Sequence, residues 1–239
     1  MRTIALVPAL NEEETIAGVV RELRAFDPDV EILVIDDGSN DHTAAIARAA
    51  GARVLRLPFN LGIGGAVQTG FRYAFENGFD LAVRVDGDGQ HDPSQLAAVV
   101  DPVLRGETDI AVGSRYLAPR AEGYRSSATR RLGIRILARV VSLLTRQRIT
   151  DPTSGFRMTN RRGIELFARD YPHDYPEVEA LVMLIRHRLR LVEVPVAMRP
   201  RAAGRSSIRA LSSVYYMVKV LLALFVGSFR RNVVPLEEK

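Results

Sequence analysis

Short apolar segments that alternate with amphipathic ones constrain the fold of this chain more than any other feature. The apolar segments have the pattern of buried strands and lie at residues 4–7, 31–35, 54–57 and 81–85. Helical patterns follow them at about residues 11–26, 43–50 and 66–77, with a Gly-rich turn at 60–65. This alternation predicts a Rossmann-like α/β fold, with a mostly parallel sheet and helices on both faces.

The pattern loosens after residue 115. There we expect the following segments: a basic helix at about 130–145, a turn-rich stretch at 151–157, a helix at about 178–188, a strand at 191–196 and a loop at 200–207. With 239 residues, 47% of them hydrophobic and 26% charged, the chain has the composition of one folded catalytic domain. We place this domain at residues 1–208 and a hydrophobic C-terminal helix and tail at 209–239.

Two acidic pairs stand directly after predicted strands, and strand carboxyl ends are where open α/β sheets bind ligands. In Asp86-Gly-Asp88-Gly-Gln90, two carboxylates two residues apart suit Mg²⁺ or Mn²⁺, with open positions left for diphosphate oxygens. A calcium-binding EF-hand would need Gly and Glu where His91 and Ala97 stand, so that loop is excluded. A merely solvated Asp-Gly turn would lack the preceding strand and the second acidic strand end.

The other acidic pair lies in Asp36-Asp37-Gly38-Ser39, whose oxygens can accept hydrogen bonds from a uracil or guanine edge and from ribose hydroxyls. The glycines at 62–65 do not form a dinucleotide-binding motif, because Val67 stands where its third Gly would be. A hydride-transfer enzyme is therefore not indicated. We interpret these glycines as a tight turn that lets the next helix approach a nucleotide.

Charge and residue usage exclude several other classes. The formal charge of +5 and the pI of about 9.9 come from an excess of Arg, which suits phosphate recognition. Trp is absent and aromatic residues make up 7%, so we expect no nucleic-acid partner. The absence of Cys excludes a disulfide, a thiolate metal site and a thiol nucleophile. The first ten residues have no signal-peptide pattern, and we expect none.

The segment 214–229 is nearly continuous in apolar residues, with Lys219 inside it and two arginines after it. Its length falls short of the ~20 residues of a spanning helix. We expect a helix that lies at a membrane interface or packs on a partner. A helix packed on the protein's own core is the alternative.

These residues together resemble the family 2 glycosyltransferases of GT-A fold, and within them the polyprenyl-phosphate (dolichyl-phosphate) sugar synthases. The resemblance covers roughly residues 2–208 and depends on six motifs in the order of that family. The motifs are Pro8-Ala-Leu-Asn-Glu-Glu13, Asp36-Asp-Gly-Ser39, Asn60-Leu-Gly62, Asp86-Gly-Asp-Gly-Gln-His-Asp-Pro93, Gly113-Ser-Arg115 and Asp151-Pro-Thr-Ser-Gly-Phe-Arg157.

The resemblance also implies site residues. Contacts with the nucleotide-sugar are expected from Pro8, Ala9, Asn11, Glu12, Asp36, Asp37, Gln68, Asp86 and Gly87. The expected ligands of Mg²⁺ or Mn²⁺ are Asp86, Asp88 and Gln90. The acceptor phosphate is expected at Arg115, Arg130, Arg131 and Ser154. The residues expected to act in catalysis are Asp88, Arg115, Arg131, Glu177 and Arg201, the last in a loop that closes over the diphosphate.

The chain departs from the commonest lipid-phosphate pattern, Asp-Ala-Asp-Leu-Gln-His, because Gly87 and Gly89 replace Ala and Leu. In this, and in its hydrophobic tail, it looks similar to bacterial polysaccharide-cluster enzymes that load GlcNAc or glucose onto undecaprenyl phosphate. Glu177 and Glu179 stand near the place where many family members carry an acidic catalytic residue, although the surrounding sequence is not the commonest form.

We therefore expect an inverting transfer of sugar from UDP-GlcNAc, UDP-Glc or GDP-Man to a polyprenyl phosphate such as undecaprenyl phosphate, for cell-envelope glycan assembly. An anionic phosphate needs no strong general base, whereas a saccharide hydroxyl, the alternative acceptor, would need Glu177 or Glu179. An inactive GT-A membrane scaffold is the alternative of another class. A nucleotidyltransferase would need a Lys that residues 8–18 lack.

The resemblance and the tail together imply a peripheral protein at the cytoplasmic face of a membrane. The membrane surface is the partner we expect besides the two substrates. A small membrane protein or a second copy of the chain stays an open possibility.

Overall fold

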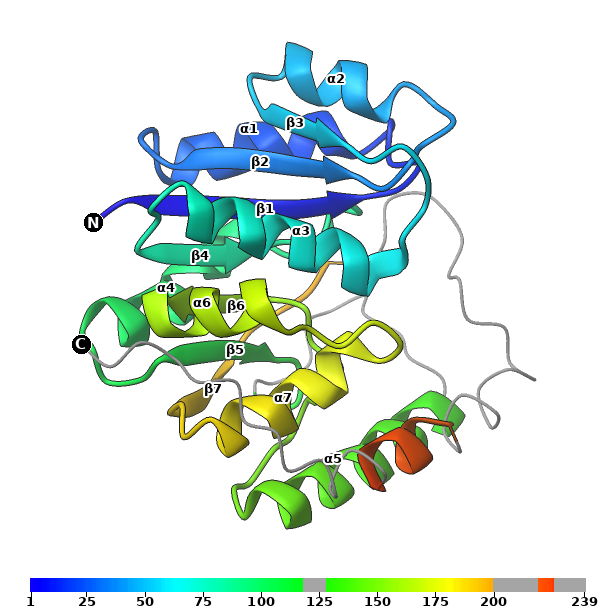
Figure 1. The fold of residues 1–239 in the computed structure, drawn as a ribbon, viewed down its shortest axis with the longest axis vertical. Coiled ribbons are helices and arrows are strands. Elements are labelled where there is room, and N and C mark those ends of the chain that lie inside the picture. Colours follow the sequence, from blue (N-terminus) through cyan, green and yellow to red (C-terminus); the bar gives the residue numbers. More distant parts are fainter. Residues whose placement is uncertain (118–127, 200–218, 226–239) are drawn as a thin grey trace.

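A computed structural model describes residues 1–117, 128–199 and 219–225, and shows an α/β fold built on one sheet (Figure 1). In the described residues the sheet has seven strands in the order β3-β2-β1-β4-β6-β5-β7. The strands are β1 Thr3–Ala9, β2 Glu31–Asp36, β3 Arg53–Arg56, β4 Leu81–Arg84, β5 Ile110–Ser114, β6 Arg157–Asn160 and β7 Leu191–Pro195. Strands β1 to β4 are mutually parallel, and β6 is antiparallel to both β4 and β5. The predicted fold class is confirmed.

Two helical layers cover the sheet because successive strand side chains point to opposite faces. Ile4 and Leu6 belong to one core cluster, with helices α3, α6 and α7. Ala5 and Val7 belong to the other, with α1, α2 and α4. The helices are α1 Ile16–Phe26, α2 Thr43–Ala49, α3 Gly62–Glu76, α4 Leu96–Leu104, α5 Ala128–Thr145, α6 Arg161–Arg169 and α7 Pro176–Arg186, with a 3₁₀ turn at Pro93–Gln95.

Helix α5 lies outside these layers, because it packs on α7 rather than on the sheet (Figure 1). A short helix at 219–225 buries Val220 and Leu224 in the core cluster that also holds Leu137 of α5. Residues 219–225 thus follow the alternative expectation, packing on the protein's own core. The rest of the predicted helix, 214–218 and 226–229, lies outside the described residues. No helix in the described ranges is both long and apolar enough to cross a membrane.

Some sequence-based boundaries were wrong. Helix α3 begins at Gly62, not at residue 66, and α1 begins at Ile16, after a turn. The Gly-rich segment is therefore helical, and its glycines serve packing: a Cβ on Gly64 would lie 2.6 Å from the Cα of His173. The sequence patterns did not reveal α4, β5, β6 or α6, and residue 157, expected in a turn, opens β6.

Replacing Gly64 by Ala should destabilise the protein by about 1–3 kcal/mol, because the methyl group would overlap the backbone of the segment after α6. Gly18 in α1 is the matched control, since a Cβ there meets nothing within 4 Å. Gly18→Ala should leave stability unchanged or raise it by roughly 0.5–1 kcal/mol. Urea unfolding of both variants measures the difference, and equal effects would contradict the packing role of Gly64.

Candidate active site

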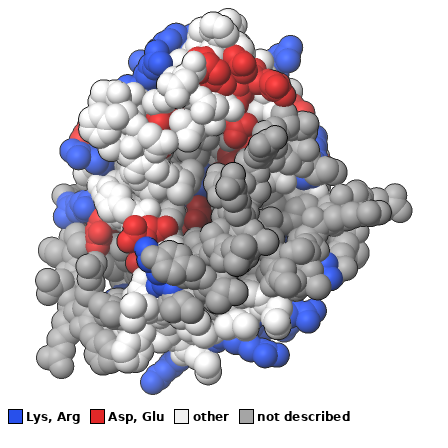
Figure 2. Space-filling model, turned by 90° about the vertical axis from the view of Figure 1, so that its right-hand side faces the viewer, with Lys and Arg blue, Asp and Glu red and all other residues white. Residues whose placement is uncertain are grey.

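The carboxyl ends of β1, β2 and β4 meet at one edge of the sheet, as their parallel pairing requires. The backbone N–H of Asp37 donates to the carbonyl of Ala9 at 2.9 Å, and that of Gly87 donates to the carbonyl of Pro8 at 3.3 Å. Figure 2 shows this side of the molecule, on which acidic side chains gather in the upper part and the middle. The first, second and fourth predicted strand ends therefore lie side by side at this edge.

The loops after β1 and β2 are hydrogen-bonded to each other. Asn11 has a positive φ of 55°, and its N–H donates to Ser39 Oγ at 2.9 Å. Its side-chain oxygen accepts from the N–H of Asn40, and the N–H of Glu12 donates to Thr43 Oγ1 at 2.8 Å. These contacts give the region predicted to bind a nucleotide a fixed backbone.

The two adjacent carboxylates in this region differ. Asp36 is fully buried, accepts from the N–H of Ser39 at 2.9 Å and pairs with Arg56 Nε at 3.3 Å. Asp37 accepts from the N–H of Leu61 at 2.7 Å, and burial raises the pKa of its carboxyl. Asp36 thus holds the turn, and the carboxylate of Asp37 ties it to the start of α3. Direct contacts of either residue with a nucleotide stay predictions.

The metal-loop candidate 86–92 is held from several sides. Asp88 is buried, and its Oδ1 accepts from the N–H of Gln90 at 3.0 Å. The carbonyl of Gln90 accepts from the N–H of Arg199 at 2.9 Å, and the guanidinium of Arg199 pairs with Asp92 at 2.9 Å and with Glu22 at 2.8 Å. The loop is therefore fixed to α1 and to the segment after β7.

A buried arginine, Arg84, lies behind this loop at the end of β4. It is 3% exposed, and its Nη2 donates to Asp86 Oδ1 at 3.1 Å and to Glu177 Oε1 at 2.9 Å. Burial acts to raise the pKa of Asp86, but the attraction of the Arg84 guanidinium outweighs it, so this pKa lies below its usual value. Asp86 is ionised at neutral pH, as a cation ligand must be.

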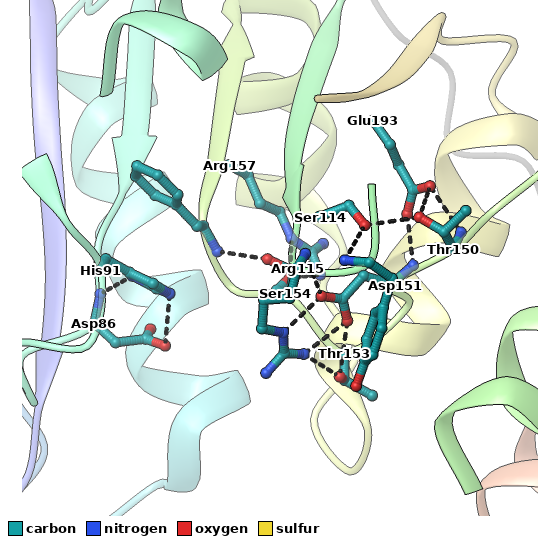
Figure 3. A network of polar contacts seen from close by, with 12 residues as sticks. Asp86, His91, Ser114, Arg115, Thr150, Asp151, Thr153, Ser154, Arg157 and Glu193 are labelled. Carbon is teal, nitrogen blue, oxygen red and sulfur yellow. Dashed lines mark hydrogen bonds and ion pairs between the residues drawn. The ribbon is translucent and has the colours of Figure 1, made fainter. Parts of the chain in front are cut away.

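His91 lies against the same carboxylate. It is buried, stacks on Phe156 with ring centroids 4.8 Å apart, and accepts at Nδ1 from the N–H of Asp86 at 3.0 Å. The ring proton is therefore on Nε2, which faces Asp86 Oδ2 at 3.7 Å (Figure 3). Burial lowers the pKa of His91 in spite of the neighbouring carboxylates, so the imidazole is neutral at pH 7.

The turn at 151–157 packs onto this cluster. Arg157 is buried and donates to the carbonyls of Ser154 at 2.8 Å and Glu177 at 3.0 Å. A Cβ on Gly155 would lie 2.9 Å from Arg84 Nη2 and 3.0 Å from Asp86 Oδ2. The turn therefore lies directly against the Arg84–Asp86 pair, which would have to shift to admit a side chain at position 155.

Arg115, predicted to bind the acceptor phosphate, is already engaged (Figure 3). Its Nε and Nη2 donate to the two oxygens of the fully buried Asp151 at 2.6 and 2.7 Å, and Nη2 also donates to Thr153 Oγ1. Glu193 in turn accepts from the N–H groups of Thr150 and Asp151, and burial raises the pKa of its carboxyl. A phosphate bound at Arg115 would have to share the guanidinium with Asp151 or displace the Asp151 carboxylate from it.

The remaining predicted residues are more scattered. Gln68 is half-buried on α3, Arg131 is half-buried on α5, and Ser154 is buried in the 151–157 turn. Arg201 and the side chain of Arg130 lie outside the described residues. In the described part of the chain no three His, Cys, Asp or Glu side chains are grouped so that they could hold a metal ion. Of the predicted ligands, only Asp86 and Asp88 belong to these residue types.

Sequence reasoning missed Arg84, Arg157 and the role of His91. A signal existed for Arg84, because a single cation inside the apolar run Leu81–Val85 needs a buried partner.

Comparison with known proteins gives matches over most of the chain. The model of a family described as "Glycosyl transferase family 2" matches residues 4–167. A UDP-N-acetylglucosamine–dolichyl-phosphate N-acetylglucosaminyltransferase of Methanococcus voltae is 31% identical over 210 residues, which cover 80% of this chain and 83% of that protein. An undecaprenyl-phosphate mannosyltransferase of Micrococcus luteus is also 31% identical, over 86% of this chain and 87% of that one.

A third relative, the polyprenol monophosphomannose synthase of Mycolicibacterium smegmatis, is 31% identical over 92% of this chain and 85% of its own length. Among solved structures, glucosyl-3-phosphoglycerate synthase of Mycobacterium tuberculosis, crystallised with Mn²⁺, UDP and glucosyl-3-phosphoglycerate, superposes with a TM-score of 0.71. It is 23% identical, and the match covers 95% of this chain and 79% of that one. This likeness supports the fold.

Removing the buried cation should unfold the site. Arg84→Met would leave Asp86 and Glu177 without their shared partner, at a cost of about 3–5 kcal/mol. Arg105→Met, which breaks an exposed pair with Glu107, is the matched control and should leave stability nearly unchanged, because water screens this pair. Chemical denaturation measures both, and an Arg84→Met protein as stable as the control would refute the role of Arg84.

Proposed function

The chain belongs to glycosyl transferase family 2, and from this we propose that it transfers a sugar from a nucleotide-sugar to a polyprenyl phosphate, with inversion at the anomeric carbon. The observation that carries the proposal is the meeting of the β1, β2 and β4 ends, where ionised Asp86 lies beside the turns at Ala9 and Asp37. The lipid-phosphate acceptor is supported by the names of three relatives that match over four fifths or more of this chain.

The donor is proposed among UDP-GlcNAc, UDP-Glc and GDP-Man. The relatives named for GlcNAc and for mannose transfer are each 31% identical to this chain, so overall identity does not distinguish the sugars. Backbone groups of residues 8–12 and the oxygens of Asp37 would bind the nucleoside, because the loops that carry them are hydrogen-bonded into one surface.

Mg²⁺ or Mn²⁺ is the proposed cofactor, held by Asp86, Asp88 and Gln90. The donor set fits a hard cation, since it offers two carboxylates and an amide oxygen, and Arg84 keeps Asp86 ionised. When bound, such an ion neutralises charge on a departing diphosphate. The chain's own contribution is to orient Asp86, through Arg84 at Oδ1 and His91 beside Oδ2.

A phosphate acceptor agrees with the position of Glu177. A saccharide hydroxyl needs a base to take its proton, but Glu177 Oε1 already accepts from the buried Arg84 at 2.9 Å. An anionic phosphate needs mainly alignment and charge stabilisation. We propose that Arg115, Arg130, Arg131 and Arg201 supply this at the cytoplasmic face of a membrane, with Ser154 beside the acceptor phosphate.

Nucleotide binding tests the metal site. Calorimetric titration should show UDP or GDP binding that depends on Mn²⁺, and Asp88→Asn should weaken it at least about tenfold by removing a charged ligand. Asp101→Asn on α4, half-exposed and remote from the strand ends, is the control and should bind as the unchanged protein does. Nucleotide binding that is absent, or that ignores the metal, would contradict the proposed site.

The acceptor class is tested by Glu179→Gln and Glu177→Gln with undecaprenyl phosphate as acceptor. The turnover of both variants should fall by much less than the ~10²-fold that loss of a general base costs. Glu177→Gln should also lower the melting temperature, because it weakens the pair with Arg84, so assays belong below its transition. A folded variant that still binds nucleotide but has lost activity would favour the hydroxyl acceptor.

A further inference from the structure

Helix α5 has one face packed on the protein and another face exposed. Its packed face includes Leu137 and Val141, which are almost fully buried in the core cluster shared with α7. On the other face Leu132 is 60% exposed, Ile136 38% and Leu143 79%. Their spacing of four and seven residues places them on one side of a helix. A folded chain leaves such a stripe in water at a cost, so it indicates a contact surface.

Arginines border this stripe. Arg135, Arg139, Arg146 and Arg148 are exposed, and with Arg115 they line a groove of about 990 Å³ along α5. No Asp or Glu is among the groove's lining residues in the described ranges, and the sequence of α5 contains none. Figure 2 shows Lys and Arg side chains along the lower edge of the strand-end side, the level at which α5 lies in Figure 1. The groove is therefore strongly cationic.

The helix at 219–225 adds apolar area. Val220 and Leu224 are buried in the core cluster that includes Leu137 and Val141, whereas Leu222 is 58% exposed and Phe225 61%. Both elements thus bury one side and expose leucine or phenylalanine on the other. We refer to the exposed side chains of α5, its arginine groove and residues 222 and 225 together as the α5 surface.

We propose that the α5 surface docks on an anionic lipid bilayer, with its apolar side chains at the headgroup boundary and its arginines on lipid phosphates. An apolar stripe bordered by cations, on a helix too polar to cross the bilayer, is the pattern of interfacial binding. A symmetric contact with a second copy would set the four exposed arginines against four, which disfavours that occupant. Arg115 lies both in the groove and beside the 151–157 turn, so docking would bring the bilayer next to the site.

This proposal deepens the proposed function. It rests on that function only in explaining why the protein needs a bilayer. Co-flotation of the full chain with phosphatidylcholine vesicles, with and without phosphatidylglycerol and at low and high salt, measures docking directly. We expect binding to the anionic vesicles that weakens at high salt, since surface charge attraction is screened.

Two double variants separate the contributions to docking. Leu132→Asp/Leu143→Asp should reduce the partition coefficient about tenfold or more. Arg135→Gln/Arg139→Gln should reduce it about fivefold per charge. The matched controls are Phe26→Asp/Leu104→Asp and Arg53→Gln/Arg105→Gln, which alter exposed positions elsewhere and should float as the unchanged protein does.

Either of two results would overturn the proposal: no binding of the unchanged protein to anionic vesicles, or α5-surface variants that bind as well as their controls. A protein that ignores vesicles but forms a dimer sensitive to the same variants would assign the surface to a second copy and also overturn it. Failure of the proposed function looks different. It would appear as absent sugar transfer to detergent-dispersed undecaprenyl phosphate by protein that still floats with vesicles.

Discussion

The ion pairs of Arg84 with Asp86 and Glu177 are the contacts on which the arrangement of the site depends. A cation buried at the end of β4 is costly unless charged partners surround it, and here they come from the metal-loop candidate and from the first turn of α7. Arg157 joins the same place by donating to the carbonyls of Ser154 and Glu177. Three segments distant in sequence thus meet at one point, and Asp86 is held ionised and oriented there.

The two halves of the chain contribute different elements to this edge of the sheet. The N-terminal half supplies parallel strand ends and hydrogen-bonded loops, a rigid surface suited to a nucleotide. The C-terminal half supplies the turn at 151–157, α7 and the arginine groove of α5, and these bring cations toward the same edge. A donor and an anionic acceptor approaching from these two sides would meet near Asp86.

The sequence predicted the first four strands because their apolar runs are short and each is closed by a proline or an aspartate. It predicted the site edge because parallel strands end together. It did not predict β6, whose four residues include Arg157 and Asn160 and show no apolar alternation. Nor did it predict that Arg115 pairs with Asp151, since 36 residues separate them and only the folded chain brings them together. Arg84 lies within an apolar run, so the strand pattern did not single it out, although a buried charge needs a charged partner.

Sugar transfer itself is the most direct test of the central claim, which joins the metal-loop candidate to a lipid-phosphate acceptor. The measurement is incubation of the protein with radiolabelled UDP-GlcNAc, UDP-Glc or GDP-Man, undecaprenyl phosphate and Mn²⁺ or Mg²⁺, followed by extraction into organic solvent. We predict an acid-labile labelled lipid from one of these donors, and none when the metal is chelated. Label that never enters the lipid phase with any donor, or that enters it equally with the metal chelated, would contradict the account.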